Sequence, residues 1–336
     1  MPLLLLSLAG CSNETSSSSE AEPPYEVKWA TPTGAPTLAF YNQASNENWL
    51  SSSNPAKDVL PHFADNAYDA LVFDGSQALT NIATNNRNYV LAEWISGGTF
   101  YVVSTQHDAS KTWDSKPRVN AFMNMGNVSK AFRDLAKNAW SWGEYASSTD
   151  VSITYGAAVS DVQKDLSSLL KAGSVENDPY DYYILAEPAY SALMSRFKAK
   201  GLPLNLVYDI QAEFKKAHDG ADVPAAAIFV NKTSYVEHKD AIDAWLNVTK
   251  QAIQDVASDL APIASKVAES DEEGNINKRF GLHSSAIQTM INLHGATANP
   301  FHYHADLDTK QKKMDYANSF QTALGAPVFD SNLFLG

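Results

Sequence analysis

Cysteine is almost absent from this sequence, since Cys11 is the only one among 336 residues. A single thiol cannot form a disulfide within the chain, so the fold depends on burial and hydrogen bonding. After the first residues, no segment reaches the roughly 18 consecutive apolar residues that a membrane-spanning helix needs. Charged residues make up only 19% of the chain and hydrophobic residues 44%. This composition agrees with an exported globular protein with a large core, and the length favours two lobes.

Basic side chains are also scarce, with 25 Lys and Arg against 38 Asp and Glu. The formal net charge of −13 argues against nucleic acid as a partner, because phosphate binding needs a concentrated cationic face. Several enzyme motifs are missing: the chain has no Gly-x-Ser-x-Gly elbow, no phosphate-binding P-loop and no His-Glu-x-x-His helix. We therefore expect a binding protein without a cofactor rather than an enzyme.

The N-terminus resembles a bacterial lipoprotein box. Leu8-Ala9-Gly10-Cys11 follows a leucine run and precedes a serine-rich stretch. Small residues leave this segment open to the processing enzymes, and the thiol then carries the lipid. The resemblance implies that residues 1–10 are a lipoprotein signal peptide, which we expect to be truncated because no Lys or Arg precedes Lys28. The alternative is a buried free cysteine.

Residues 11–24 are mostly serine, glutamate and proline, which predicts a flexible tether. From Tyr25 onwards, short β-branched or aromatic runs alternate with helical patterns, as in α/β proteins. An acidic stretch at 271–274 has no apolar periodicity and is expected to be a loop. The predicted strands are Val27 to Trp29, Ala70 to Phe73, Tyr89 to Glu93, Phe100 to Ser104, Val119 to Met123, Val151 to Tyr155, Tyr182 to Ala186 and Ala225 to Val230.

Small polar turns lie at or just after the ends of these strands. In an open α/β sheet the ligand binds beyond the carboxyl ends of the strands, where glycines and helix N-termini approach it closely. We therefore expect these turns to converge on one pocket. Each turn also fits a purely structural role, because glycines satisfy tight turns and Ser or Asn caps helices. The turns cover residues 31–36, 74–77, 96–99, 124–127, 155–158 and 186–188.

The order of these turns, together with segments 68–73 and 223–232, resembles the type II solute-binding proteins of ABC importers, in the branch of thiamine-precursor, sulfonate and nitrate receptors. This resemblance implies an α/β, two-lobed type II periplasmic-binding-protein-like fold with a hinge and an interlobe ligand cleft. It assigns residues 25–115 and 225–336 to lobe 1 and residues 116–224 to lobe 2.

The ligand-binding residues that the resemblance implies come from both lobes. Asp74 departs from the family, in which a neutral residue is usual at this position. Trp94 is an additional aromatic candidate, and its alternative role is packing in a sheet. The candidates are Thr33, Gly34, Asp74, Ser76, Gln77, Trp94 and Thr99 in lobe 1 and Gly126, Asn127, Tyr155, Gly156 and Glu187 in lobe 2.

The six turns contain Asp74 and Glu187 but no Lys or Arg, whereas an anion would normally recruit a cationic side chain. We expect a neutral or cationic nitrogenous nutrient, such as a pyrimidine-type vitamin precursor, held by closure of the lobes. The resemblance implies a lipid-anchored extracytoplasmic monomer that contacts ABC permease subunits. Three alternatives stay open: an anion receptor of the same fold, a pyrimidine-synthase-like enzyme, and a surface adhesin.

Two histidines, His302 and His304, flank Tyr303 near the C-terminus. On a strand, residues two apart project from one face, so both imidazoles could ligate one metal ion, with Asp306 next on that face. The run matches no recognised metal-site signature. We therefore expect no metal.

The lipoprotein interpretation predicts that Cys11 carries the acyl chains, because it is the only thiol. Radiolabelled palmitate fed to a bacterial host should enter the protein and be absent from the Cys11→Ser variant. If no label enters the protein that retains Cys11, the assignment is refuted.

Overall fold

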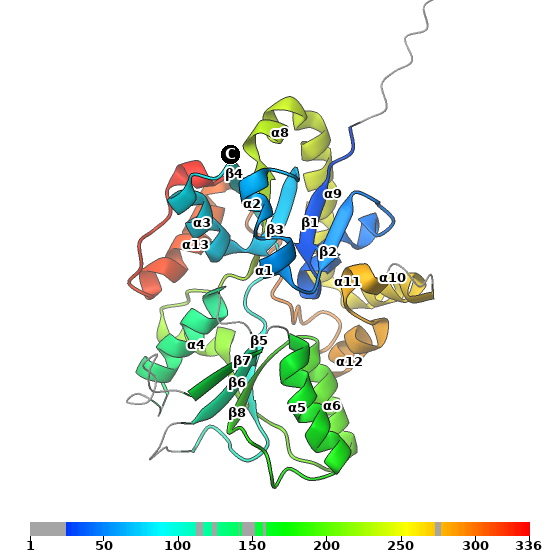
Figure 1. Ribbon diagram of the computed structural model, residues 1–336, viewed down its shortest axis with the longest axis vertical. Coiled ribbons are helices and arrows are strands. Elements are labelled where there is room, and N and C mark those ends of the chain that lie inside the picture. The colour runs from blue at the N-terminus through cyan, green and yellow to red at the C-terminus, as the bar shows by residue number, and fades with distance from the viewer. Residues whose placement is uncertain are drawn as a thin grey trace, which may run out of the picture.

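The computed structural model describes residues 25–111, 117–122, 126–140, 142, 152–156, 159–272 and 277–336. Its described part is organised by two five-stranded sheets, which form an upper and a lower lobe in Figure 1. Cys11 and the rest of segment 1–24 lie outside the described residues. No helix in the described ranges has the length and apolar character needed to cross a membrane.

The first sheet has the strand order β2-β1-β3-β10-β4. Strand β1 runs parallel to β2 and β3, whereas β10 comes from much later in the chain and pairs antiparallel with both β3 and β4. Buried side chains pack on both faces of this sheet, as expected for strands covered by helices on each side. The strands are β1 (Trp29–Pro32), β2 (Trp49–Ser52), β3 (Ala70–Asp74), β4 (Tyr89–Trp94) and β10 (Ala226–Asn231).

Helices from two distant stretches of the chain cover the first sheet (Figure 1). Those before β4 are η1 (Ala35–Gln43), α1 (Pro55–Asp58), α2 (His62–Asp65) and α3 (Gly75–Asn85). Those after β10 are α8 (Lys232–Glu237), α9 (Lys239–Ser258), α10 (Leu260–Glu272), α11 (Asn277–Phe280), α12 (Ser284–His294), α13 (Lys310–Ala323) and η3 (Ser331–Leu333).

The second sheet has the strand order β7-β6-β8-β5-β9. It also separates two apolar clusters: one includes residues of α4 and α7, and the other includes residues of α5 and α6. Its strands are β5 (Phe100–Ser104), β6 (Arg118–Phe122), β7 (Ser152–Gly156), β8 (Tyr182–Ala186) and β9 (Asn205–Asp209). Its helices are α4 (Gly126–Asn138), α5 (Val159–Ala172), α6 (Ala189–Ala199) and α7 (Ile210–Ala217).

Each strand predicted from the sequence overlaps a strand of the structure, and β5 and β8 have the predicted bounds. Strands β2 and β9 were not predicted. Both lie at sheet edges, where exposure on one side weakens the apolar pattern that identifies a strand. The expected loop at 271–274 is wrong for its first two residues, because α10 continues through Glu272.

The expected lobe boundary at residue 115 conflicts with the strand pairing. Strand β5 belongs to the second sheet, where it pairs antiparallel with β8 and β9. The chain therefore leaves the first lobe between Trp94 and Phe100. Helix α13 also departs from the expected division, because Tyr316 packs in a first-lobe cluster and Phe320 packs in a second-lobe cluster.

The lobes are joined by chain segments that hydrogen-bond to one another. Gly98 N donates to Val223 O at 2.7 Å and Ala225 N donates to Ser96 O at 3.0 Å. A third segment joins them, since Gly97 N donates to the carbonyl of His302 at 2.9 Å. A side chain at Gly97 would meet three groups at 3.3 Å, so this glycine allows the segments to approach closely. The junction is thus a small antiparallel ladder.

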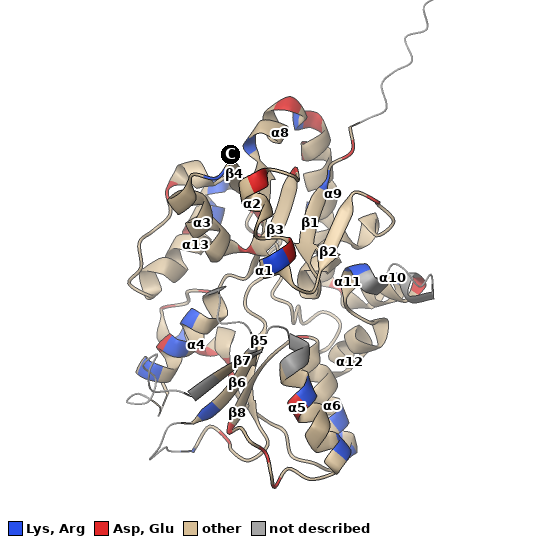
Figure 2. Cartoon of the chain, viewed as in Figure 1, with Lys and Arg blue, Asp and Glu red and all other residues tan. Residues whose placement is uncertain are grey.

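The charged side chains show no concentration on one lobe in the view of Figure 2, where blue and red positions are spread over the helices of both lobes. Helices α4, α5 and α6 each carry basic residues. This scatter, with the net charge of −13, is typical of a solvated surface.

Close packing between Gly75 and Trp94 generates a stability prediction. A Cβ atom at Gly75 would lie 2.0 Å from Cζ3 of Trp94, whose side chain is 1% exposed. We expect Gly75→Ala to lower the free energy of unfolding by about 1–3 kcal/mol, because the buried indole must shift. Urea denaturation measures the change.

The matched test is Gly75→Ala in a Trp94→Phe background. Phenylalanine lacks the distal indole atoms, so the cost of the alanine should fall by more than half. An equal cost in both backgrounds would contradict the packing explanation.

Candidate functional site at the lobe junction

One carboxylate, that of Asp74, caps helices from both lobes. Asp74 ends β3 and is the N-cap of α3, where its Oδ1 accepts a hydrogen bond from Gln77 N at 2.9 Å. Its Oδ2 accepts from Asn127 N, in the first turn of α4, at 3.2 Å. Aspartate is favoured at this position because it satisfies unpaired N–H groups and complements the positive end of the helix. The lobes therefore meet at two helix N-termini.

The Asn127 side chain makes the second link across the junction. Its Nδ2 donates to Ser76 Oγ at 2.9 Å and to Pro224 O at 2.8 Å. A carbonyl oxygen only accepts, so the Pro224 contact sets the orientation of the amide. Its Oδ1 is then a buried acceptor with no partner among the described residues, and Gln77 Oε1 is another. Both acceptors would be satisfied by a donor from a ligand.

Burial raises the pKa of Asp74 to about 6, although hydrogen bonds from Gln77 and Asn127 and the charge of Lys130 oppose the shift. A carboxyl group with this pKa is mostly ionised at neutral pH and becomes neutral in mildly acidic solution. The junction therefore changes charge within a physiological range of pH.

Glu187 forms a separate contact between the lobes. It follows β8, and its fully buried carboxylate accepts from Ser191 Oγ at 2.8 Å. Nε2 of His294, the last residue of α12, lies 2.7 Å from the same Oε1 atom. Helix α12 packs against α6, and the rings of Tyr101 and Tyr190 stack nearby at 4.2 Å. The lone pairs of Oε1 are thus occupied by the protein itself.

The remaining lobe 1 candidates hydrogen-bond to partners other than Asp74. Thr33 N donates to Ser52 O at 2.8 Å, and Gly34, with a φ of 100°, donates to Phe280 O at 2.7 Å. The buried Thr99 accepts at its carbonyl from Glu187 N at 3.1 Å. Trp94 lies in the core of the first lobe, where its Nε1 donates to Lys313 O at 3.0 Å.

The predicted lobe 2 residues are only partly described. Gly126 begins α4, and Tyr155 and Gly156 end β7. The orientation of the Tyr155 side chain lies outside the described part of the structure, as do residues 124–125 and 157–158 of the predicted turns. The structure therefore brings together Asp74, Ser76, Gln77 and Asn127, and it leaves the place of Tyr155 as a prediction.

Sequence reasoning missed three residues of this region: Pro224, Ser191 and His294. Ser191 lies one helical turn after Glu187, so its spacing was a detectable signal. His294 is more than 100 residues away in the chain, and nothing local connects it with Glu187.

Residues 302–304 do not form a strand, which was the condition for His302 and His304 to ligate one metal ion together. Only Tyr303 forms an isolated bridge, to Ser96, and His302 has a φ of 48°, in the left-handed region. The imidazoles are therefore not alternate residues of one strand face. Burial lowers the pKa of both. In the described ranges, no group of three or more His, Cys, Asp or Glu is placed to hold a metal ion.

Comparisons by sequence find no match: no family model and no curated protein resembles this chain. Solved structures do match along nearly its whole length. The alkanesulfonate-binding protein SsuA from Xanthomonas axonopodis pv. citri, bound to MOPS, is 13% identical with a TM-score of 0.59. The alignment covers 94% of this chain and 99% of that one.

Two further structures show the same likeness. A zinc-bound ligand-binding component of an ABC-type import system from Staphylococcus aureus is 8% identical, with a TM-score of 0.62 and coverage of 93% and 97%. A Candida albicans protein described as having the generic periplasmic-binding-protein fold is 11% identical, with a TM-score of 0.52 and coverage of 93% of each chain. At these identities the likeness concerns the fold, and it confirms the expected periplasmic-binding-protein architecture.

The raised pKa of Asp74 predicts a pH-dependent stability. The folded protein binds this proton more tightly than the unfolded chain, whose aspartate has a pKa near 3.8. The contribution of Asp74 is therefore most favourable below about pH 4 and declines as pH rises to about 6. Asp74→Asn retains an N-cap without the charge. Relative to the wild type, its free energy of unfolding should rise by up to about 2 kcal/mol between pH 4 and pH 7.

Urea denaturation of both proteins at intervals of half a pH unit measures this difference. Because other titrating groups are common to both proteins, they cancel in the comparison. A difference that stays constant with pH would contradict the shift.

Proposed function

We propose that this protein is the extracytoplasmic solute-binding component of an ABC importer, and that it captures its solute between the two lobes. The observation that carries the proposal is the junction itself, where Asp74 from one lobe and Asn127 from the other meet at the starts of α3 and α4. A ligand that touches both lobes favours the closed arrangement by bridging them. The import-system proteins of similar fold support this role.

The chemistry of the junction favours a ligand that donates hydrogen bonds. Asn127 Oδ1 and Gln77 Oε1 are acceptors without partners among the described residues, and Asp74 is an anion above about pH 6. Amines and amino-heterocycles present N–H donors to such groups. We therefore propose a small neutral or cationic nitrogenous nutrient, such as an amino-pyrimidine vitamin precursor.

An anion is the second candidate, because helix N-termini attract anions and one protein of similar fold binds sulfonates. The starts of α3 and α4 are, however, already served by the Asp74 carboxylate. An anionic ligand would have to lie beside that charge. This repulsion is our reason to favour the nitrogenous ligand.

The proposal extends to the way in which the protein is held outside the cell. Lipid on Cys11, followed by segment 11–24 as a tether, would attach the folded part that begins near Tyr25 to the membrane.

We propose that the protein works as a monomer that presents the closed form to the permease subunits. Its task is binding without chemical change, and the Glu187 contacts with Ser191 and His294 support a structural use of that carboxylate.

A ligand panel tests the proposed function. Amino-pyrimidines and small amines at about 100 times their Kd should stabilise the native protein by about 2.7 kcal/mol, which raises Tm by a few degrees. Alkylsulfonates and nitrate should have no such effect. Differential scanning fluorimetry screens the panel, and isothermal titration calorimetry measures the affinities.

The decisive variant is Asn127→Ala. It should weaken binding at least tenfold, because the ligand loses Asn127 Oδ1 as the acceptor of one of its hydrogen bonds. Asn138→Ala, at the far end of the same helix, is the matched control and should bind normally. Tight binding of an alkylsulfonate alone would reverse the ligand preference. Absence of any ligand, with no compaction by X-ray scattering, would refute the solute-binding role.

A further inference from the structure

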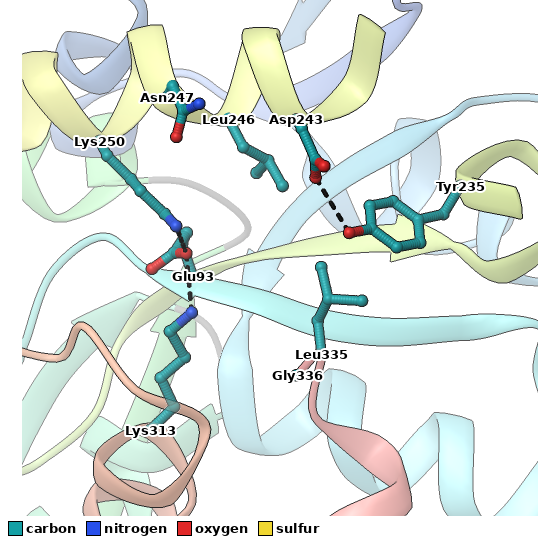
Figure 3. A pocket seen from close by; sticks show the side chains of 9 residues that line it. All are labelled: Glu93, Tyr235, Asp243, Leu246, Asn247, Lys250, Lys313, Leu335 and Gly336. Atoms are coloured by element: carbon teal, nitrogen blue, oxygen red, sulfur yellow. Dashed lines mark hydrogen bonds and ion pairs between the residues drawn. The ribbon is translucent and has the colours of Figure 1, made fainter. Parts of the chain in front are cut away.

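A polar pocket of about 210 Å³ lies in the first lobe at the edge of its sheet, and none of its lining residues belongs to the lobe junction. Figure 3 shows its walls: Glu93 comes from β4, Lys250 and Asn247 from α9, and Lys313 from α13. Strand β4 is an edge strand, so helices from both faces of the sheet reach its side. The pocket is thus lined from both α9 and α13 beside β4.

Two ammonium groups share one carboxylate oxygen in this pocket. Nζ of Lys250 and Nζ of Lys313 each lie 2.7 Å from Glu93 Oε1 (Figure 3). The side chains of Glu93 and Lys313 are only 8% and 7% exposed, whereas that of Lys250 is 41% exposed. These three side chains carry one positive charge in excess when all are ionised. The excess is local, because the whole chain has a net charge of −13.

The carboxylate on the opposite wall does not neutralise this excess. Asp243 accepts from Tyr235 OH at 2.9 Å and forms an ion pair with Lys239, one turn earlier in α9. It therefore has a cation of its own. Burial lowers the pKa of Lys313, and the Glu93 carboxylate opposes that shift. The positive charge of Lys313 is therefore supported by Glu93.

The pocket also has more hydrogen-bond donors than its own acceptors use. An ammonium group has three N–H donors. Among the described residues, Lys313 uses two of them, on Ala92 O and Glu93, and Lys250 uses one, on Glu93. The Asn247 amide lines the same space. Donors left over on two cations are the arrangement that an oxyanion satisfies.

We propose that this pocket binds a small oxyanion, a carboxylate or a phosphate, at a site separate from the lobe junction. The anion is held by Lys250 and Lys313 on the pocket side of Glu93, with Asn247 as a further donor. Leu246, Leu335 and Gly336 also line the pocket, and its volume of about 210 Å³ suits a compact ligand better than a long one. Because Lys250 and Lys313 come from helices on opposite faces of the sheet, the bound anion ties α9 to α13.

The test is a titration of the full chain with inorganic phosphate and, separately, with acetate, at constant ionic strength maintained with chloride. Amide resonances of Asn247 and Leu335 are followed by NMR. Saturable shifts at these residues with either anion support the site, and the anion that binds more tightly identifies its class. Linear, unsaturated shifts with both anions overturn the proposal.

Lys250→Gln is the variant to compare, because its half-exposed side chain can be replaced without emptying the core. It should weaken binding of the anion at least tenfold. Lys216→Gln, an equal charge change at an exposed position of α7, should leave the affinity unchanged. Asn247→Ala provides a second, uncharged variant and should weaken binding severalfold.

Two outcomes separate this site from the proposed importer function. Saturation that persists in Lys250→Gln overturns the anion pocket and leaves the solute-binding role untouched. Shifts confined to Asn127 and Gln77 also overturn the anion pocket, and they point to an anionic ligand at the lobe junction instead.

Discussion

The backbone ladder between the lobes is the constraint on which the rest of the structure depends. Hydrogen bonds from Gly98 to Val223 and from Ala225 to Ser96 hold two crossing segments side by side, and the segment at His302 joins them through Gly97. The same ladder positions Pro224, whose carbonyl orients the Asn127 amide. The ladder therefore supplies one contact of the candidate site, so the geometry of the ladder and that of the site are coupled.

The two junction carboxylates have different surroundings and so different uses. Glu187 is saturated by Ser191 and His294, and its contacts join α6 to α12. Among the described residues, Asp74 accepts hydrogen bonds from backbone N–H groups of the two helix starts, and burial raises its pKa to about 6. A carboxylate engaged by its own protein is suited to holding the lobes together, whereas one with titratable charge at their meeting point is suited to recognising a ligand.

Helix α13 connects features that are otherwise separate. Its Lys313 reaches Glu93 at the sheet edge, its Tyr316 contacts Trp94 in the first-lobe core, and its Phe320 packs on Phe214 of the second lobe. The helix therefore crosses the lobe boundary on the side of the hinge. Side-chain packing along this one helix adds to the connections between the lobes that hydrogen bonds make.

Local patterns in the sequence determined most of the strands, the alternation of strands and helices, and the polar turns that include Asp74, Ser76 and Asn127. These features depend on side-chain periodicity and capping, which act over a few residues. Only the tertiary structure decided that β5 joins the second sheet, that α13 spans both lobes, and that Glu187 meets His294. The same is true of the Lys250 and Lys313 pair on Glu93. Such contacts join residues far apart in the chain, and their partners are selected by the packing of whole elements, which no local pattern records.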